Sequence, residues 1–200
     1  MPAPIDFYFD FSSPYGYLAS RKIDALAAAH GREVNWRPIL LGVAFKVTGM
    51  APLPQLPLKG PYSMRDFLRS ARFHDIPYRQ PATFPVSTIA GARAFYWLQE
   101  RDRAKAVEFA KTLYNAYFTE DLDISKPENV LQIARKLGVN ADELGAALND
   151  PVLKEKTKSE VDAAVAKGVF GSPYIVVDGE PFWGMDRLDQ IERWLAKGPF

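Results

Sequence analysis

The sequence contains no cysteine, and this absence excludes disulfide bonds, thiolate metal ligands and redox chemistry by a thiol of the protein itself. Any thiol chemistry must therefore use a thiol that a ligand carries. An excess of charge of one sign is also missing, because 25 basic and 24 acidic residues leave a formal charge of +1 at pH 7. Such a chain has no general attraction for nucleic acid or for an anionic membrane. We therefore expect neither as a partner.

Long apolar runs and histidines are also scarce. No window approaches the roughly 20 uninterrupted apolar residues that cross a bilayer. The amino-terminal segment lacks a basic start followed by a continuous apolar stretch, because Asp6 and Asp10 interrupt it. These features predict a protein without a secretion signal, located in the cytoplasm. His30 and His74 lie outside any Ser-His-Asp or metal-ligand spacing, so we expect neither a histidine-based mechanism nor a metal site.

The residues that are present are typical of a globular protein. Hydrophobic residues make up 48% and charged residues 24% of the chain, which is ordinary usage for a folded domain. A length of 200 residues predicts one core, or one core with an inserted lobe.

The first forty residues have the pattern of a β-α-β unit. Residues Ile5 to Phe11 are aromatic and β-branched and are followed by Ser12, Ser13 and a proline, which predicts a buried strand. A helix with apolar positions at helical spacing follows and stops at Gly31. Val34 to Leu40 is the second predicted strand. A crossover of this length makes the two strands parallel, with a right-handed connection.

The other end of the chain supplies two more strands. Tyr174–Val177 and Glu180–Trp183 flank an Asp-Gly turn, which predicts a hairpin, and an apolar face over Asp186–Leu195 predicts a closing helix. Residues 42 to 165 have almost no strand signal and predict a helical lobe. Its expected helices are Met64–Phe73, Ser87–Gln99, Arg103–Phe118, Lys126–Leu137, Ala141–Leu148 and Pro151–Lys167. The segment APLPQLPLKGP, residues 51 to 61, carries four prolines and is expected to form a stiff extended loop or a proline-rich docking peptide.

Three places are candidates for chemistry, and each has a purely structural alternative. Ser13-Pro14 lies where the first strand passes into a helix, at the edge of the sheet where α/β proteins bind ligands, but Ser13 can equally be a helix cap. Ser172-Pro173 precedes the third strand, and the proline can simply open that strand. Asp186 can receive an ammonium group of a ligand or cap the last helix.

These three places, in this order around a helical middle, resemble the glutathione-dependent 2-hydroxychromene-2-carboxylate isomerases and the kappa-class glutathione transferases. The similarity runs nearly from end to end. It includes FYFDFSSPYGYLAS, LKGPYSMRDF, FPVSTIAGARA and GVFGSPYIVVDGEPFWGMDRL. The resemblance implies an α/β, thioredoxin-like fold, made of residues 1–41 and 166–200 and interrupted by a helical insertion of residues 42–165. It also implies a homodimer.

The resemblance further implies a glutathione site on top of the sheet. Redox relatives of this fold carry a Cys-X-X-Cys motif in the first helical turn, whereas this chain has Ser13-Pro14-Tyr15-Gly16. By analogy, the Ser13 hydroxyl donates a hydrogen bond to the glutathione sulfur, although the neighbouring Ser12 is a second candidate. The resemblance implies further contacts with glutathione. Ser172, before a cis Pro173, would contact the cysteinyl unit, and Asp186 would bind the γ-glutamyl ammonium group. Lys59 would bind a glutathione carboxylate, and Met185 would contact glutathione at the position where transferases have a serine.

For an isomerase, the resemblance implies that the sulfur adds to a conjugated side chain, permits rotation and leaves, so that glutathione is a true cofactor. A thiol with a pKa of about 8.5 becomes a thiolate at neutral pH when backbone N–H groups and a hydroxyl stabilise it. The substrate would be a small aromatic carboxylate. Its expected apolar walls are Phe45, Met50, Phe84, Phe170 and Trp183; Met50 stands where kappa transferases commonly have an asparagine.

Three functions remain open at this point. The first is a glutathione-dependent isomerase of an aromatic-degradation intermediate such as 2-hydroxychromene-2-carboxylate. The second is a kappa-type transferase or peroxidase, which consumes glutathione. The third is a thioredoxin-like binding protein without catalysis, which predicts that Ser13→Ala leaves its biological role intact.

Overall fold

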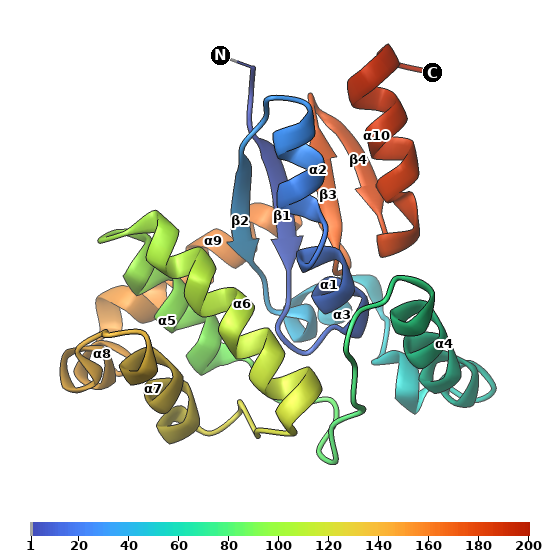
Figure 1. The fold of residues 1–200 in the computed structure, drawn as a ribbon. Coiled ribbons are helices and arrows are strands. Elements are labelled where there is room, and N and C mark those ends of the chain that lie inside the picture. Colours follow the sequence, from blue (N-terminus) through green and yellow to red (C-terminus); the bar gives the residue numbers. More distant parts are fainter. Residues whose placement is uncertain (1) are drawn as a thin grey trace.

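The computed structural model describes residues 2–200 and contains one four-stranded sheet surrounded by helices (Figure 1). The strands lie in the order β2-β1-β3-β4, so the two ends of the chain build one sheet. Strand β2 is parallel to β1, whereas β3 is antiparallel to both β1 and β4. The strands are β1 (Ile5–Phe9), β2 (Val34–Pro38), β3 (Tyr174–Val177) and β4 (Glu180–Trp183).

The chain between β2 and β3 is helical throughout its regular elements, which agrees with the thioredoxin-like fold with a helical insertion that the family resemblance implied. Figure 1 shows α5 to α8 together below the β2 edge and α4 on the opposite side, near α1. The helices are α1 (Pro14–Ser20), α2 (Ile23–Ala29), α3 (Leu41–Thr48), η1 (Leu53–Gln55), α4 (Lys59–Phe73), α5 (Ile89–Gln99), α6 (Arg103–Glu120), α7 (Pro127–Lys136), α8 (Ala141–Ala147), α9 (Pro151–Ala166), η2 (Met185–Arg187) and α10 (Leu188–Lys197). Within residues 2–200, no helix combines the length and the apolar character that a membrane span needs.

Two predictions near the amino terminus are wrong in their extent. Strand β1 ends at Phe9 rather than Phe11, because the backbone N–H of Asp10 donates to the Ser172 hydroxyl instead of to a strand. The single helix predicted up to His30 is two helices. After α1, backbone N–H groups donate to carbonyls three residues back, as in the 3.3 Å hydrogen bond from the Arg21 N–H to the Leu18 carbonyl. This tighter pattern is typical of the end of an α-helix.

The loop predicted over residues 51–61 is only partly correct. Residues Leu53–Gln55 form a short 3-10 helix, and α4 begins at Lys59 with Pro61 as its third residue. Proline is tolerated there because the first N–H groups of a helix have no partner inside it. Helix α3 was not predicted at all. At the carboxyl end, the α-helix begins at Leu188 after the short η2, and Asp186 makes no capping hydrogen bond.

The core joins the sheet to the inserted helices. Phe9 is fully buried, and its ring centroid lies 5.3 Å from Trp36, 5.8 Å from Phe95 on α5 and 5.7 Å from Tyr114 on α6. Aromatic pairs at such separations add to the free energy of simple burial. The sheet and the insertion therefore pack as one hydrophobic core.

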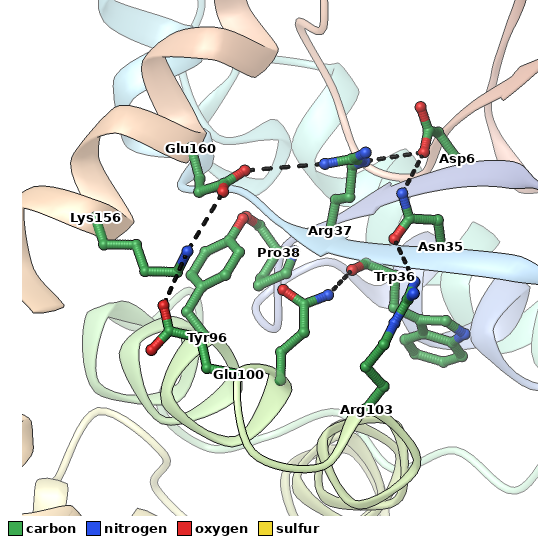
Figure 2. Close-up of polar contacts among 11 residues, drawn as sticks. Asp6, Asn35, Trp36, Arg37, Pro38, Tyr96, Glu100, Arg103, Lys156 and Glu160 are labelled. Carbon is green, nitrogen blue, oxygen red and sulfur yellow. Dashed lines mark hydrogen bonds and ion pairs between the residues drawn. The ribbon is translucent and has the colours of Figure 1, made fainter.

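Polar groups cover the free edge of the sheet at β2 (Figure 2). Tyr96 and Gln99, both on α5, donate to the carbonyls of Pro38 at 2.7 Å and of Trp36 at 3.3 Å. Arg37, on the same strand, lies 3.9 Å from the carboxylate of Glu160 on α9. These contacts satisfy edge carbonyls that another strand would otherwise pair with.

Candidate functional site

Ser13 lies at the junction of β1 and α1, at the carboxyl end of the central parallel strand. Its side chain accepts a hydrogen bond from the Gly16 N–H at 3.0 Å, and Pro14 occupies the first helical position. The structural alternative is thus correct, since Ser13 is a helix cap. The same hydroxyl donates to the Ser172 carbonyl at 2.8 Å, which lies 159 residues away in the chain. The fold therefore brings two of the three candidate places together.

The neighbouring Ser12 has a different environment. Its hydroxyl donates to the carboxylate of Asp10 at 2.8 Å. A serine hydroxyl has a single proton to donate, so in this arrangement the proton of Ser12 is already bound to a buried acid. The Ser13 proton is also bound, but its acceptor is the neutral Ser172 carbonyl, and a hydrogen bond to a neutral acceptor is weaker than one to a carboxylate. Redirecting the Ser13 proton toward a ligand therefore costs less free energy than redirecting the Ser12 proton.

The loop at Ser172 packs closely on the start of α1. The Ser172–Pro173 peptide bond is cis, and the Ser172 hydroxyl accepts from the Asp10 N–H at 2.9 Å. Tyr114, fully buried on α6, donates to the Asp10 carbonyl at 2.8 Å. A Cβ atom on Gly16 would lie 2.7 Å from both the Ser172 hydroxyl and the Tyr114 hydroxyl. Only glycine fits at this position without a shift of that network.

The third candidate place lies beside α1 in the short helix η2. The Asp186 side chain is 73% exposed, and its nearest ion-pair partner is Arg187 at 3.6 Å, so the carboxylate is available to a ligand. Met185 is 4% exposed, and its side chain belongs to the core. Lys59 is an exposed first residue of α4 and forms no ion pair with the residues that the structure describes.

A hydrogen bond connects α1 to the helix that carries Lys59. The Tyr15 hydroxyl donates to Asp66 on α4 at 2.5 Å, and the Tyr15 ring packs on Phe67 with centroids 5.0 Å apart. Burial raises the pKa of Tyr15, and the hydrogen bond to Asp66 raises it further. Tyr15 is therefore a neutral donor, and neither it nor Asp66 was among the predicted site residues.

The expected substrate walls come from four separate segments of the chain. Phe170 and Trp183 are in contact, with centroids 4.9 Å apart, and Trp183 is half exposed. Phe84 instead packs toward Phe67 at 6.1 Å. The two remaining residues belong to the α3 region, where Phe45 is half-buried and Met50 is exposed.

Two hollows lie elsewhere on the molecule. One of about 390 Å³ opens between β2, α5 and α6 and is lined by Trp36, Phe95 and Arg103 among others. Another of about 120 Å³ lies between α3, α5 and α9. Neither of these two hollows is lined by Ser13, Ser172 or Asp186. In residues 2–200, no three His, Asp or Glu side chains are grouped so that they could hold a metal ion.

Neither Asp10 nor Tyr114 was among the predicted site residues. The Asp10 carbonyl accepts hydrogen bonds from both the Ser13 N–H and the Tyr114 hydroxyl. An acid within an apolar segment was a weak signal for Asp10, and no local signal distinguishes Tyr114 from the other aromatic residues of its helix.

The chain belongs to the family of DSBA-like thioredoxin domains, whose model matches residues 4–196. Among individual proteins, it is 31% identical over 201 residues to a 2-hydroxychromene-2-carboxylate isomerase of Sphingobium xenophagum, covering 98% of this chain and 99% of the relative. It is 28% identical to glutathione S-transferase kappa 2 of Caenorhabditis elegans, covering 98% and 94%. A solved structure of a 2-hydroxychromene-2-carboxylate isomerase superposes with a TM-score of 0.86 at 28% identity, covering 96% of this chain and 94% of the other.

Proposed function

We propose that this protein is a glutathione-dependent isomerase that converts 2-hydroxychromene-2-carboxylate, or a similar aromatic-degradation intermediate, to trans-o-hydroxybenzylidenepyruvate or its equivalent. The observation that carries the proposal is the Ser13 hydroxyl, 2.8 Å from the Ser172 carbonyl, in a chain without a thiol of its own. The isomerase relatives support this reaction class.

The chemistry of the available groups fits glutathione. This tripeptide carries two carboxylates, one ammonium group and a thiol. The unpaired cation of Lys59 suits a carboxylate, and the exposed carboxylate of Asp186 suits the ammonium group. Ser172 offers backbone groups to the cysteinyl unit. Bound glutathione would supply the thiolate that adds to the conjugated side chain of the substrate, allows rotation about the resulting single bond and leaves unchanged.

Ser13 has the role of activator rather than nucleophile in this proposal. Its hydroxyl proton now lies on the Ser172 carbonyl, and the Gly16 N–H holds the oxygen. Rotation about the Cβ–Oγ bond would turn the proton toward a sulfur atom while the oxygen stays in place. A hydrogen bond to a thiolate favours the charged form and lowers the thiol pKa.

Calorimetric titration with reduced glutathione, with an ultraviolet difference scan for thiolate at pH 7, tests the proposal. We expect saturable binding that is weakened in Asp186→Ala, and a thiolate signal that is lost in Ser13→Ala. Asp189→Ala is the matched control, because Asp189 is also exposed and lies three residues further on. Ser13→Ala removes a helix cap that is worth about 1 kcal/mol, so its thermal unfolding is measured first. Absence of binding at millimolar glutathione contradicts the proposal.

A kappa-type transferase is the second candidate, and the kappa relatives favour it. The two reactions differ in the fate of glutathione. An isomerase leaves its concentration unchanged during turnover, whereas a transferase or peroxidase consumes it. Quantifying free thiol during conversion of the chromene carboxylate therefore distinguishes them. A non-catalytic binding protein, the third function, predicts instead that neither the wild type nor Ser13→Ala converts a substrate and that Ser13→Ala leaves the biological role intact.

A further inference from the structure

Asp10 is a nearly fully buried acid directly after β1, with 2% of the residue exposed. Its carboxylate accepts four hydrogen bonds. The N–H and the hydroxyl of Ser12 bind one oxygen, both at 2.8 Å, and the Thr88 hydroxyl binds the same oxygen at 3.1 Å. The Leu41 N–H binds the other oxygen at 2.7 Å. The four donors therefore come from three separate segments: the turn before α1, the start of α3 and the residue before α5.

The backbone of Asp10 contacts the rest of the site. Its N–H donates to the Ser172 hydroxyl at 2.9 Å, and its carbonyl accepts from the Ser13 N–H at 2.9 Å and from Tyr114 at 2.8 Å. One residue thus connects the activating serine, the cis-proline loop and three helices of the insertion.

The carboxylate has no cation within ion-pair distance among residues 2–200, so hydrogen-bond donors alone stabilise its charge. Burial raises the pKa of Asp10, and the four hydrogen bonds oppose this effect. An ionised carboxylate offers only acceptors, which matches four donors that converge from two sides. An asparagine cannot reproduce this pattern. Its NH2 group would face either the Leu41 N–H or the donors of Ser12 and Thr88, and a buried donor facing a donor is costly.

We propose that Asp10 is the positioning residue of this site, whose carboxylate fixes the Ser13 turn relative to the starts of α3 and α5. Two consequences follow. The first is structural: without the carboxylate, the Ser13 hydroxyl moves away from Gly16 and Ser172. The second rests on the proposed function: Asp10 aligns the group that activates the thiol with the helices that would hold the aromatic substrate.

The structural consequence is tested without glutathione, by amide hydrogen exchange in Asp10→Asn. The Gly16 N–H reports the placement of the Ser13 hydroxyl, because it donates to that oxygen. The Ile175 N–H, in the central strand β3, reports global unfolding. We expect exchange at Gly16 to accelerate about tenfold relative to Ile175, as for the loss of one hydrogen bond. Equal acceleration at both amides means that Asp10 only stabilises the fold and overturns the proposal.

Two further variants make this test decisive. Asp6→Asn is the matched control, because Asp6 is an acid on β1, the strand that precedes Asp10, but binds Asn35 and Arg37 at a partly exposed position. It is expected to leave the ratio of the two rates unchanged. Thr88→Val removes one donor while keeping size and charge, and Thr88 makes no capping bond to α5. Thr88→Val is expected to raise the ratio of the Gly16 to the Ile175 exchange rate, but by less than Asp10→Asn does. It takes the place of Asp10→Asn in the test if that variant does not fold. An unchanged ratio in the Thr88 variant then overturns the proposal.

The catalytic consequence is that Asp10→Asn should change kcat much more than the KM for glutathione. We expect kcat of Asp10→Asn to fall between about 10- and 100-fold, because a misplacement of about 1 Å has effects of that size. The KM for glutathione should change little, since Lys59, Asp186 and the Ser172 backbone remain in place. If the wild type does not bind glutathione, the proposed function fails while the exchange experiment still decides the role of Asp10. Wild-type kcat in Asp10→Asn overturns the catalytic part.

Discussion

Gly16 illustrates how one missing side chain determines the geometry of the site. Helix position alone predicts that alanine is better than glycine by up to about 1 kcal/mol. A Cβ here, however, would lie 2.7 Å from two hydroxyl groups, on Ser172 and Tyr114, that are both hydrogen-bonded to Asp10. We expect Gly16→Ala to lower the free energy of unfolding by about 1–3 kcal/mol, the usual effect of overpacking, as measured by urea denaturation.

Gly42→Ala is the matched control for this prediction. Gly42 is also in the first turn of a helix, α3, but a Cβ there would meet nothing within 4 Å. It is expected to be neutral or slightly stabilising. If both variants behave alike, the close approach at Gly16 does not constrain the site. The same crowding applies to the place of the second cysteine of a Cys-X-X-Cys motif, so the packing as well as the composition of this chain opposes dithiol chemistry.

At the scale of elements, the contact of α1 with α4 positions Lys59 relative to Ser13. The main polar interaction in this contact is the hydrogen bond from the Tyr15 hydroxyl to Asp66. Burial alone would raise the pKa of Asp66, but the hydrogen bonds from Tyr15 and Arg69 outweigh it and hold this pKa below its ordinary value of 3.8. A carboxyl with a lowered native pKa stabilises the fold above its ordinary pKa, and this stabilisation is lost as the pH falls through the native pKa.

Tyr15→Phe is therefore expected to lower the free energy of unfolding by about 1 kcal/mol at neutral pH. The difference from the wild type should stay constant above about pH 5 and shrink below about pH 4, where Asp66 becomes protonated. Denaturation across this pH range measures it. Tyr17→Phe on the same helix is the control, because Tyr17 donates to the neutral Pro77 carbonyl at 2.7 Å. A pH-dependent loss in the control, or none in Tyr15→Phe, contradicts this account.

Elements with strong local signals were predicted with correct bounds. The hairpin Tyr174–Val177 and Glu180–Trp183 has β-branched residues and an Asp-Gly turn, and both strands agree with the structure. Helix α3 escaped prediction because its cap residue, Leu40, has no side-chain capping bond and only Ala44 on the helix is buried. A short helix without a cap or an apolar face leaves no pattern in the sequence.

At the scale of the whole molecule, periodicity could not predict which strands are neighbours. The pairing of Phe7 on β1 with Ile175 on β3 joins segments from opposite ends of the chain, and only the family resemblance indicated it. The network around Asp10 has the same character. Its members at positions 41, 88, 114 and 172 lie far apart in the chain, so their roles depend on the tertiary fold and not on any local motif.

A chain of ion pairs also connects the sheet to the insertion across the β2 edge (Figure 2). Arg37 binds Asp6 at 2.9 Å and Glu160 on α9 at 3.9 Å, and Glu160 also lies 3.8 Å from Lys156. The Arg37 side chain is 30% exposed, so its pairs retain part of their strength in water. Because this charge network spans both parts of the fold, its contribution belongs to their association rather than to either part alone.

Arg37→Met is expected to lower the free energy of unfolding by about 1–2 kcal/mol at low salt, because Asp6 and Glu160 then lose the cation that they share. The difference should narrow in about 1 M NaCl, where the Debye length is about 3 Å. Arg103→Met is the control: Arg103 reaches the same strand through the neutral Asn35 oxygen at 3.3 Å, so its loss should not depend on salt. Paired urea titrations at two salt concentrations measure both variants. If the Arg37 variant shows no salt dependence, the aromatic core around Phe9, and not this network, determines how the insertion sits on the sheet.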